Sequence, residues 1–223
     1  MQLFLKNTCL FCLLLWLPLV APAQTVQSVS FSATDGGEIH GTLYHQSGEQ
    51  GVVLAHGAIF NKESWRPLAR FLADHGLTVL AIDFRGYGDS RPGTQSSALE
   101  LDILAAIHFL HQQQKIRNVS VLGASMGGGA AARAAIASEP GSIDKLILLS
   151  PVPVQHPEKI QGNKLFIASK DEPLATQVKA QYQLAPEPKK LQLIAGSAHA
   201  QHIFKTTHGE ELRQVILNFL LSK

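Results

Sequence analysis

Short, mainly apolar runs that lack a regular polar alternation recur along this sequence, and they limit its fold more than any other feature. They lie at 52–55, 77–82, 119–122, 146–149, 165–168 and 191–195. Strands that are buried on both faces have this composition. Segments with helical spacing lie between or after them, at 63–75, 96–113, 126–138, 174–184 and 210–221. This order predicts an α/β fold with a mostly parallel sheet and helices on both faces.

The first part of the expected domain has a different pattern. Residues 26–33 and 39–45 alternate between apolar and polar side chains, and Asp35-Gly36-Gly37 between them is typical of a tight turn. We therefore expect an antiparallel opening hairpin at one edge of the sheet. The chain has 223 residues, of which 45% are hydrophobic and 16% charged, which suits one globular domain over 24–223.

The first 23 residues have the composition of a signal peptide. Lys6 precedes an apolar run at 9–20, and small residues follow at Ala21 and Ala23. This order predicts cleavage after Ala23 and export to the periplasm or the medium. The alternative is a membrane anchor, but the run is short and Pro18 interrupts its end. We expect no stable membrane anchor after cleavage.

Removal of this segment would change the cysteine and charge counts. Cys9 and Cys12 are the two cysteines of the chain, so residues 24–223 contain no thiol. Loss of Lys6 leaves 18 basic residues against 17 acidic ones. A nearly neutral chain without a basic run gives no reason to expect a nucleic-acid partner. Zinc-ligand spacings, phosphate loops and dinucleotide fingerprints are also missing from the sequence, so we expect no metal and no cofactor.

The stretch GASMGG at 123–128 follows one expected strand and precedes an alanine-rich expected helix. A serine at a sharp strand-to-helix turn presents its hydroxyl above the sheet. The residues two positions before and after it must be small, and Gly123 and Gly127 meet that need. The amino end of the following helix favours negative charge near Ser125. The pattern therefore predicts that Ser125 is a nucleophile.

In these features the sequence resembles the α/β-hydrolase superfamily, and the resemblance covers nearly all of 24–223. It implies an oxyanion hole made by two backbone N–H groups. One belongs to Met126, directly after the serine. The other follows the His56-Gly57 pair and maps to Ala58, with Ile59 as the neighbouring candidate. We interpret the His56 ring as structural.

A second segment also resembles the family. Residues 83–90 read DFRGYGDS, similar to the family's D-x-R-G-x-G-x-S. We expect Asp83 and Arg85 to form a pair that fixes a loop and to take no part in catalysis.

A nucleophilic serine needs a histidine base and a carboxylate, which follow it in that fold in the order acid, then histidine. Four histidines follow Ser125. His199 lies in a small-residue loop after the last expected strand, where the resemblance places the catalytic base. His202 is its nearest rival. His208 flanks the closing helix, and His156 lies too early in a proline-rich loop.

The carboxylate should follow the preceding strand. The resemblance assigns it to Asp171, while Glu172 is adjacent but is expected to point elsewhere. Asp144 lies at the start of a strand, at the opposite end of the sheet, and Asp102 is expected on an exposed helix face. One departure concerns Ala168, which stands where the family often has glycine and weakens the placement of Asp171.

The resemblance implies a serine hydrolase that cleaves a carboxylic ester or a related small acyl compound through an acyl-enzyme, and the expected signal peptide implies that it is exported. Acyl transfer, thioester hydrolysis and a non-catalytic binding module are the alternatives, and the sequence does not define the oligomeric state. Residues 151–163 are too few for a helical cap domain, so we expect an open, shallow site. Phe60, Trp65 and Tyr87 are candidate lining residues, although each also suits ordinary packing.

Overall fold

The computed structural model describes residues 25–222, so the expected signal peptide at 1–23 lies outside the described residues. Eight strands form one sheet in the order β1-β2-β4-β3-β5-β6-β7-β8. The β1–β2 and β2–β4 pairs are antiparallel, and all other pairs are parallel. The strands are β1 Thr25–Ser32, β2 Glu38–His45, β3 Gln50–Ala55, β4 Thr78–Ile82, β5 Asn118–Ala124, β6 Lys145–Leu149, β7 Asn163–Ser169 and β8 Lys189–Ile194.

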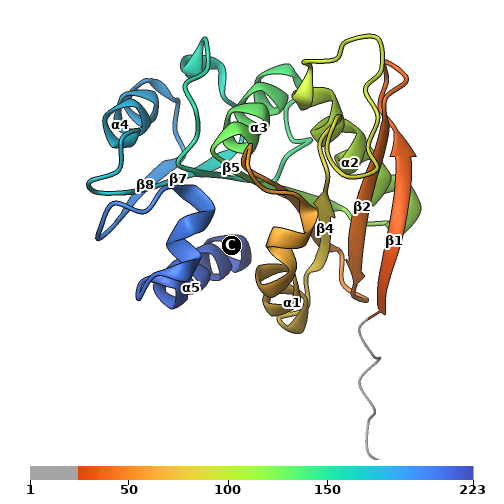
Figure 1. The fold of residues 1–223 in the computed structure, drawn as a ribbon, viewed down its shortest axis with the longest axis horizontal. Helices are drawn as coiled ribbons and strands as arrows, with labels where there is room; N and C mark the ends of the chain where they lie inside the picture. The colour runs from red at the N-terminus through yellow and green to blue at the C-terminus, as the bar shows by residue number, and fades with distance from the viewer. Residues whose placement is uncertain (1–24, 223) are drawn as a thin grey trace, which may run out of the picture.

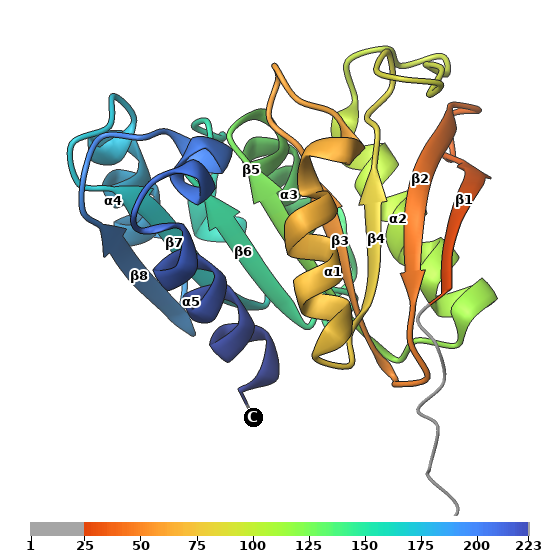
Figure 2. The same cartoon turned by 60° about the horizontal axis from the view of Figure 1, so that its bottom comes forward.

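Helices cover both faces of this sheet. Helices α2 (Leu99–Gln114), α3 (Met126–Ala137) and α4 (Ala175–Leu184) lie on one face, and α1 (Arg66–Asp74) and α5 (Gly209–Leu221) lie on the other (Figure 1). Figure 2 shows α1 and α5 in front of the sheet. The predicted fold class, including the antiparallel opening hairpin, is confirmed.

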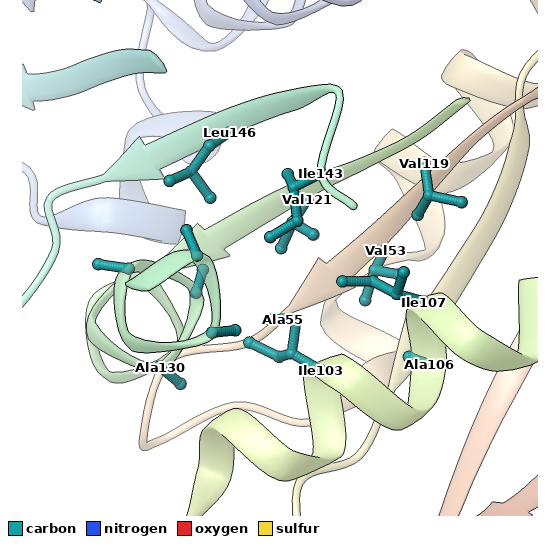
Figure 3. Close-up of a cluster of buried hydrophobic side chains, with 14 of the residues drawn as sticks. Val53, Ala55, Ile103, Ala106, Ile107, Val119, Val121, Ala130, Ile143 and Leu146 are labelled. Atoms are coloured by element: carbon teal, nitrogen blue, oxygen red, sulfur yellow. The ribbon is translucent and has the colours of Figure 1, made fainter. Parts of the chain in front are cut away.

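The central strand β3 shows why its sequence has no polar alternation. Val52 and Leu54 pack in the cluster under α1 and α5, whereas Val53 and Ala55 pack in the cluster under α2 and α3. Figure 3 shows the second cluster, with Ala55 of β3 beside Ile103 of α2 and Val53 beside Ile107. Successive side chains of a strand point to opposite faces, so burial on both faces requires an unbroken apolar run.

Three connections at the carboxyl ends of the parallel strands contain short 3₁₀ helices. A 3₁₀ helix, η1 (Lys62–Trp65), precedes α1, and another, η3 (Ala200–Lys205), follows β8. Between β6 and β7 the only helical segment is η2 (Pro157–Lys159), which is too short to form a cap. No helix within residues 25–222 has the length and apolar character needed to cross a membrane.

Candidate active site

Ser125 occupies the junction between β5 and α3 in a strained backbone conformation. Its φ is 51° and its ψ is −113°, outside the regions that residues with a side chain usually adopt. Such a conformation costs about 1–3 kcal/mol and persists only where the surroundings impose it. Here the Ser125 N–H donates to the Leu149 carbonyl at 2.9 Å, and its carbonyl accepts from the Val152 N–H at 3.1 Å. These contacts anchor the turn to the end of β6.

The glycines on either side of Ser125 permit this turn by close backbone packing. A Cβ on Gly123 would lie 2.2 Å from the Gly127 carbonyl oxygen. A Cβ on Gly127 would lie 2.4 Å from the carbonyl oxygen of Ala55, at the end of β3. Both positions therefore exclude any side chain, which is the physical reason for the G-x-S-x-G spacing.

His199 joins Ser125 to a carboxylate on another loop. Its Nε2 lies 2.9 Å from the Ser125 Oγ, and its Nδ1 makes a short hydrogen bond with the Glu172 Oε2. A carboxylate only accepts hydrogen bonds, so Nδ1 carries the hydrogen and Nε2 is free to accept the serine proton. The structure thus brings Ser125 and His199 together, as the sequence predicts.

Glu172 takes the position beside His199 that was expected for Asp171, so the expectation for Asp171 is wrong. The Asp171 residue is exposed, and its backbone N–H donates to the Gly196 carbonyl at 3.0 Å. The physical reason is the length of β7, which continues to Ser169, one residue beyond the expected end at Ala168. The turn consequently starts later and directs the next carboxylate, Glu172, into the protein.

The Glu172 carboxylate is held by groups on both sides. Its side chain is fully buried, and its Oε1 accepts from the Ser150 Oγ at 2.6 Å and from the Ser169 N–H at 3.0 Å. The Ser150 Oγ also accepts from the Ala200 N–H at 3.2 Å. Ser150 follows β6 with a positive φ of 47°. Ser150 could not be identified from the sequence, because its partners are 22 and 50 residues away.

The loop after β3 holds one peptide group in a defined orientation. The Gly57 carbonyl accepts from the Phe60 N–H at 3.0 Å and lies 2.9 Å from the His56 Nδ1. In a trans peptide the C=O and N–H point in opposite directions, so these bonds turn the Ala58 N–H away from Phe60 and His56. Ala58 and Ser125 line the same pocket of about 150 Å³.

Met126, the other predicted donor, is the first residue of α3. The first N–H groups of a helix have no partner within the helix, and they favour negative charge. The predicted oxyanion donors, Ala58 and Met126, thus flank Ser125 from two different elements, and their role stays a prediction.

Gln201 connects the histidine loop to the loop after β3. Its side chain is buried, its Oε1 accepts from the Gly57 N–H at 2.8 Å, and its Nε2 donates to the Ser64 Oγ at 2.8 Å. The Ser64 Oγ in turn donates to the Asn61 carbonyl at 2.5 Å. One buried amide thereby links the segment that carries His199 to both ends of the 57–64 loop.

The His56 ring has a structural role in this loop. It is fully buried, and its Nε2 accepts from the Phe84 N–H at 3.2 Å while its Nδ1 faces the Gly57 carbonyl. Burial lowers the pKa of His56, which favours the neutral ring that these two bonds require.

Asp83 and Arg85 both fix loops, but they do not pair with each other as expected. The Asp83 carboxylate accepts from the Lys62 N–H at 2.7 Å and from its Nζ at 2.5 Å. Arg85 instead pairs with Asp35 at 2.8 Å and with Asp102 at 2.7 Å. Asp102 is fully buried, so its expected placement on an exposed helix face is wrong.

The other histidines after Ser125 do not contact its hydroxyl. His202 is exposed, lines the pocket beside Ser125 and lies 5.2 Å from the Phe60 ring between centroids. His208 contacts Glu211 at 3.1 Å at the start of α5, and His156 contacts Glu158 at 3.0 Å in the β6–β7 connection.

The three aromatic residues proposed to line the site have different surroundings. Phe60 lines the pocket that contains Ser125. The Tyr87 hydroxyl donates to the Ala58 carbonyl at 3.0 Å and lies 3.7 Å from the Met126 sulfur. Trp65 is 1% exposed and belongs to the core under α1 and α5.

A family model described as "alpha/beta hydrolase fold" matches residues 51–165, about half of the chain, including the Ser125 turn. The chain belongs to this family. The match ends before Glu172 and His199, so these two residues are placed by the structure alone.

Two relatives match this chain over different lengths. A non-heme chloroperoxidase of Streptomyces lividans is 35% identical over 103 residues, which cover 46% of this chain and 37% of the relative. The matched part is therefore less than half the length of that relative. The uncharacterised protein YfhR of Escherichia coli K12 is 25% identical over 253 residues, covering 89% of this chain and 81% of YfhR.

Solved structures of other hydrolases share the fold at low sequence identity. The esterase Pf2001 of Pyrococcus furiosus has a TM-score of 0.77 and 19% identity, and the match covers 88% of this chain and 92% of the esterase. A dienelactone hydrolase of Anabaena variabilis has a TM-score of 0.75 and 21% identity over 89% of this chain and 97% of that chain. At these identities the likeness concerns the fold.

Proposed function

We propose that this protein is a serine hydrolase that cleaves small carboxylic esters or related acyl compounds. The observation that carries the proposal is the hydrogen-bonded series from Ser125 through His199 to Glu172. A nucleophile, a base in contact with it and a buried group that orients the base together support acyl transfer to the serine. Similarity to the esterase fold is consistent with this chemistry but does not define the substrate.

In the first half-reaction, the Ser125 Oγ attacks the acyl carbonyl carbon and its proton passes to the Nε2 of His199. The carbonyl oxygen becomes an oxyanion, for which the N–H groups of Ala58 and Met126 are the proposed donors. When the tetrahedral intermediate collapses, the bond to the leaving oxygen breaks and that oxygen takes the proton from His199. Glu172 stabilises the imidazolium that exists between these two transfers.

In the second half-reaction, water replaces the leaving group. The water oxygen attacks the acyl carbon of the ester on Ser125, and His199 accepts one proton from this water. Collapse of the second intermediate breaks the bond to the Ser125 Oγ, which recovers the proton from His199. The products are a carboxylic acid and the alcohol, and the enzyme returns to its starting state.

The experiment combines active-site labelling with ester turnover. Wild-type protein, Ser125→Ala and His199→Ala are treated with a fluorophosphonate, and hydrolysis of p-nitrophenyl acetate and butyrate is followed in parallel. We expect labelling to disappear in Ser125→Ala and turnover to disappear in both variants. Folded wild-type protein that neither labels nor hydrolyses ester would contradict the proposal and favour a non-catalytic binding module.

The same residues support acyl transfer and thioester hydrolysis, which differ in the second substrate or the leaving group. Product analysis with an added alcohol acceptor, and with a thioester in place of the ester, separates these activities.

We also propose that the protein is exported, on the basis of residues 1–23 alone. Amino-terminal sequencing of the protein from periplasm or medium should begin at Gln24, whereas a start within 1–23 would contradict it.

A further inference from the structure

A second cavity lies beside the catalytic pocket and takes no part in the proposed chemistry. Its volume is about 410 Å³, against about 150 Å³ for the pocket that contains Ser125. It lies between the 60–68 segment and the segment that runs from η3 into α5. Its apolar side chains include Phe60, Trp65, Leu68 and Phe204.

Phe60 is the common wall of the two cavities, because it lines both of them. Its ring lies 5.2 Å from the His202 ring, which lines the catalytic pocket. Lys205, which lines the larger cavity, has its Nζ 6.0 Å from the centroid of the same ring. Residues of η3 alternate between the cavities in the same way: Ala200 lines the smaller one and Gln201 the larger one.

We propose that the larger cavity receives the alkyl chain of an ester whose carbonyl lies at Ser125, and that Phe60 controls the passage of this chain. This inference rests on the proposed function. The volume falls within the range of about 300–1,000 Å³ that is typical of small-ligand sites, and a mainly apolar lining with a few polar groups is typical of them. The small catalytic pocket alone would restrict the enzyme to short esters.

Trp65 allows direct detection of a ligand in this cavity. The chain has two tryptophans, Trp16 and Trp65, so the full chain with Trp16→Phe has Trp65 as its single tryptophan. Titration with sodium octanoate should change the Trp65 emission in a saturable way, whereas sodium acetate at the same concentrations should not. An emission that octanoate leaves unchanged would overturn the proposal, whether or not the protein hydrolyses esters.

Ester kinetics then test whether the cavity serves the reaction. Burial of a methylene contributes about 0.8 kcal/mol, or about fourfold in kcat/KM if the whole chain is buried in the transition state. We expect the ratio of kcat/KM for p-nitrophenyl octanoate over acetate to exceed about tenfold in the wild type. Leu68→Trp, which fills part of the cavity, should lower this ratio, and Phe60→Ala should raise it.

The matched control is Leu184→Trp, which places the same side chain at an exposed leucine on α4. It should leave the ratio unchanged. Fluorophosphonate labelling of Ser125 reports whether each variant is folded. The alkyl chain in the cavity belongs either to the acyl group or to the alcohol of the ester. Octyl acetate distinguishes these two cases, because it carries the chain on the alcohol side. A ratio that responds to neither Leu68→Trp nor Phe60→Ala, with labelling intact, would overturn the proposal.

The result also separates this inference from the proposed function. Octanoate binding without labelling or turnover would show a ligand cavity but would contradict both the hydrolase and the role of the cavity in substrate binding. Turnover without octanoate binding would leave the hydrolase standing and remove this inference alone.

Discussion

Glu172 accepts the Nδ1 hydrogen bond of His199 from a fully buried position, whereas the His199 side chain itself is 32% exposed. In the proposed mechanism, the orienting group is thus shielded from water while the base is open to substrate. A buried carboxylate that accepts several hydrogen bonds is fixed in position, and it fixes the histidine with it.

The neighbouring carboxylates provide a first test. Glu172→Gln removes the charge that stabilises the imidazolium, and we expect kcat for p-nitrophenyl acetate to fall by about 10²–10⁴-fold. Asp171→Asn is the matched control, because its side chain belongs to an exposed residue outside the hydrogen-bonded series. The kcat of Asp171→Asn should remain within about twofold of the wild-type value, since surface substitutions usually have small effects. Equal losses in the two variants would contradict the assignment of Glu172.

Two glycines of α3 should respond differently to the same substitution. A Cβ on Gly127 would meet the Ala55 carbonyl oxygen at 2.4 Å, so backbone must move. At Gly129 the contact is the Val152 Cγ2 at 2.4 Å, which belongs to a side chain. Gly127→Ala should lower the free energy of unfolding by about 3 kcal/mol or more.

Gly129→Ala should lower the free energy of unfolding by less than about 1 kcal/mol. The clash with the Val152 side chain is offset there, because alanine improves helix propensity by about that amount. Urea denaturation of both variants, followed by circular dichroism, measures the difference. A Gly127→Ala protein as stable as Gly129→Ala would contradict the close packing of the turn against β3.

Gln201 should affect catalysis through the 57–64 loop. Gln201→Leu removes the acceptor of the Gly57 N–H, so the Ala58 peptide is less well oriented toward the oxyanion. Loss of one oxyanion donor costs about 10²–10³-fold in kcat, and a misoriented donor should cost about 10–10²-fold. Gln201→Glu keeps the acceptor for Gly57 and should retain more activity than Gln201→Leu. Equal losses in the two variants would show that the bond from the Gln201 Nε2 to Ser64, which both variants lack, matters more than the bond to Gly57.

The ion pairs of Arg85 should make the free energy of unfolding depend on pH in the acidic range. The side-chain hydrogen bond from Arg85 lowers the pKa of Asp35 from 3.8 to about 2. A carboxyl whose pKa is lower in the folded state stabilises that state above its unfolded pKa, and this contribution disappears as the pH falls. The difference in unfolding free energy between wild type and Asp35→Asn should therefore be largest above pH 4 and shrink toward pH 2.

Asp144→Asn is the control for this measurement, since its carboxylate is half-exposed and lies 4.0 Å from its nearest cation. Its difference from wild type should stay small over the same range. A stability difference for Asp35→Asn that grows on acidification would contradict the Arg85 pairing.

The layer arrangement could be predicted because it depends on local patterns. The apolar run at 52–55 is buried on both faces, and the GASMGG stretch forms the turn that its spacing implies. The predicted carboxylate, Asp171, is one residue away from the observed one, Glu172. The reason is that pairing with neighbouring strands sets where a strand ends, and β7 pairs with β8 through Ser169. Ala168, which stands where the family often has glycine, was the one sequence feature that weakened the placement of Asp171.

Long-range polar partners could not be predicted. Arg85 bonds to Asp35, 50 residues away, and Gln201 bonds to Gly57, 144 residues away. Nothing in the spacing of such residues indicates which carboxylate or amide a given loop will meet. Asp102 was placed on an exposed face for the same reason, since its partner was unknown.

Three consecutive residues after β8 each contact a different part of the site. His199 contacts Ser125 and Glu172, the Ala200 N–H donates to Ser150, and Gln201 binds the Gly57 N–H. His199 and the 57–64 loop, which carries the proposed oxyanion donor Ala58, therefore have a common mechanical support. A displacement of this tripeptide would disable proton transfer and charge stabilisation together, so the site should lose activity as one unit and not in separate steps.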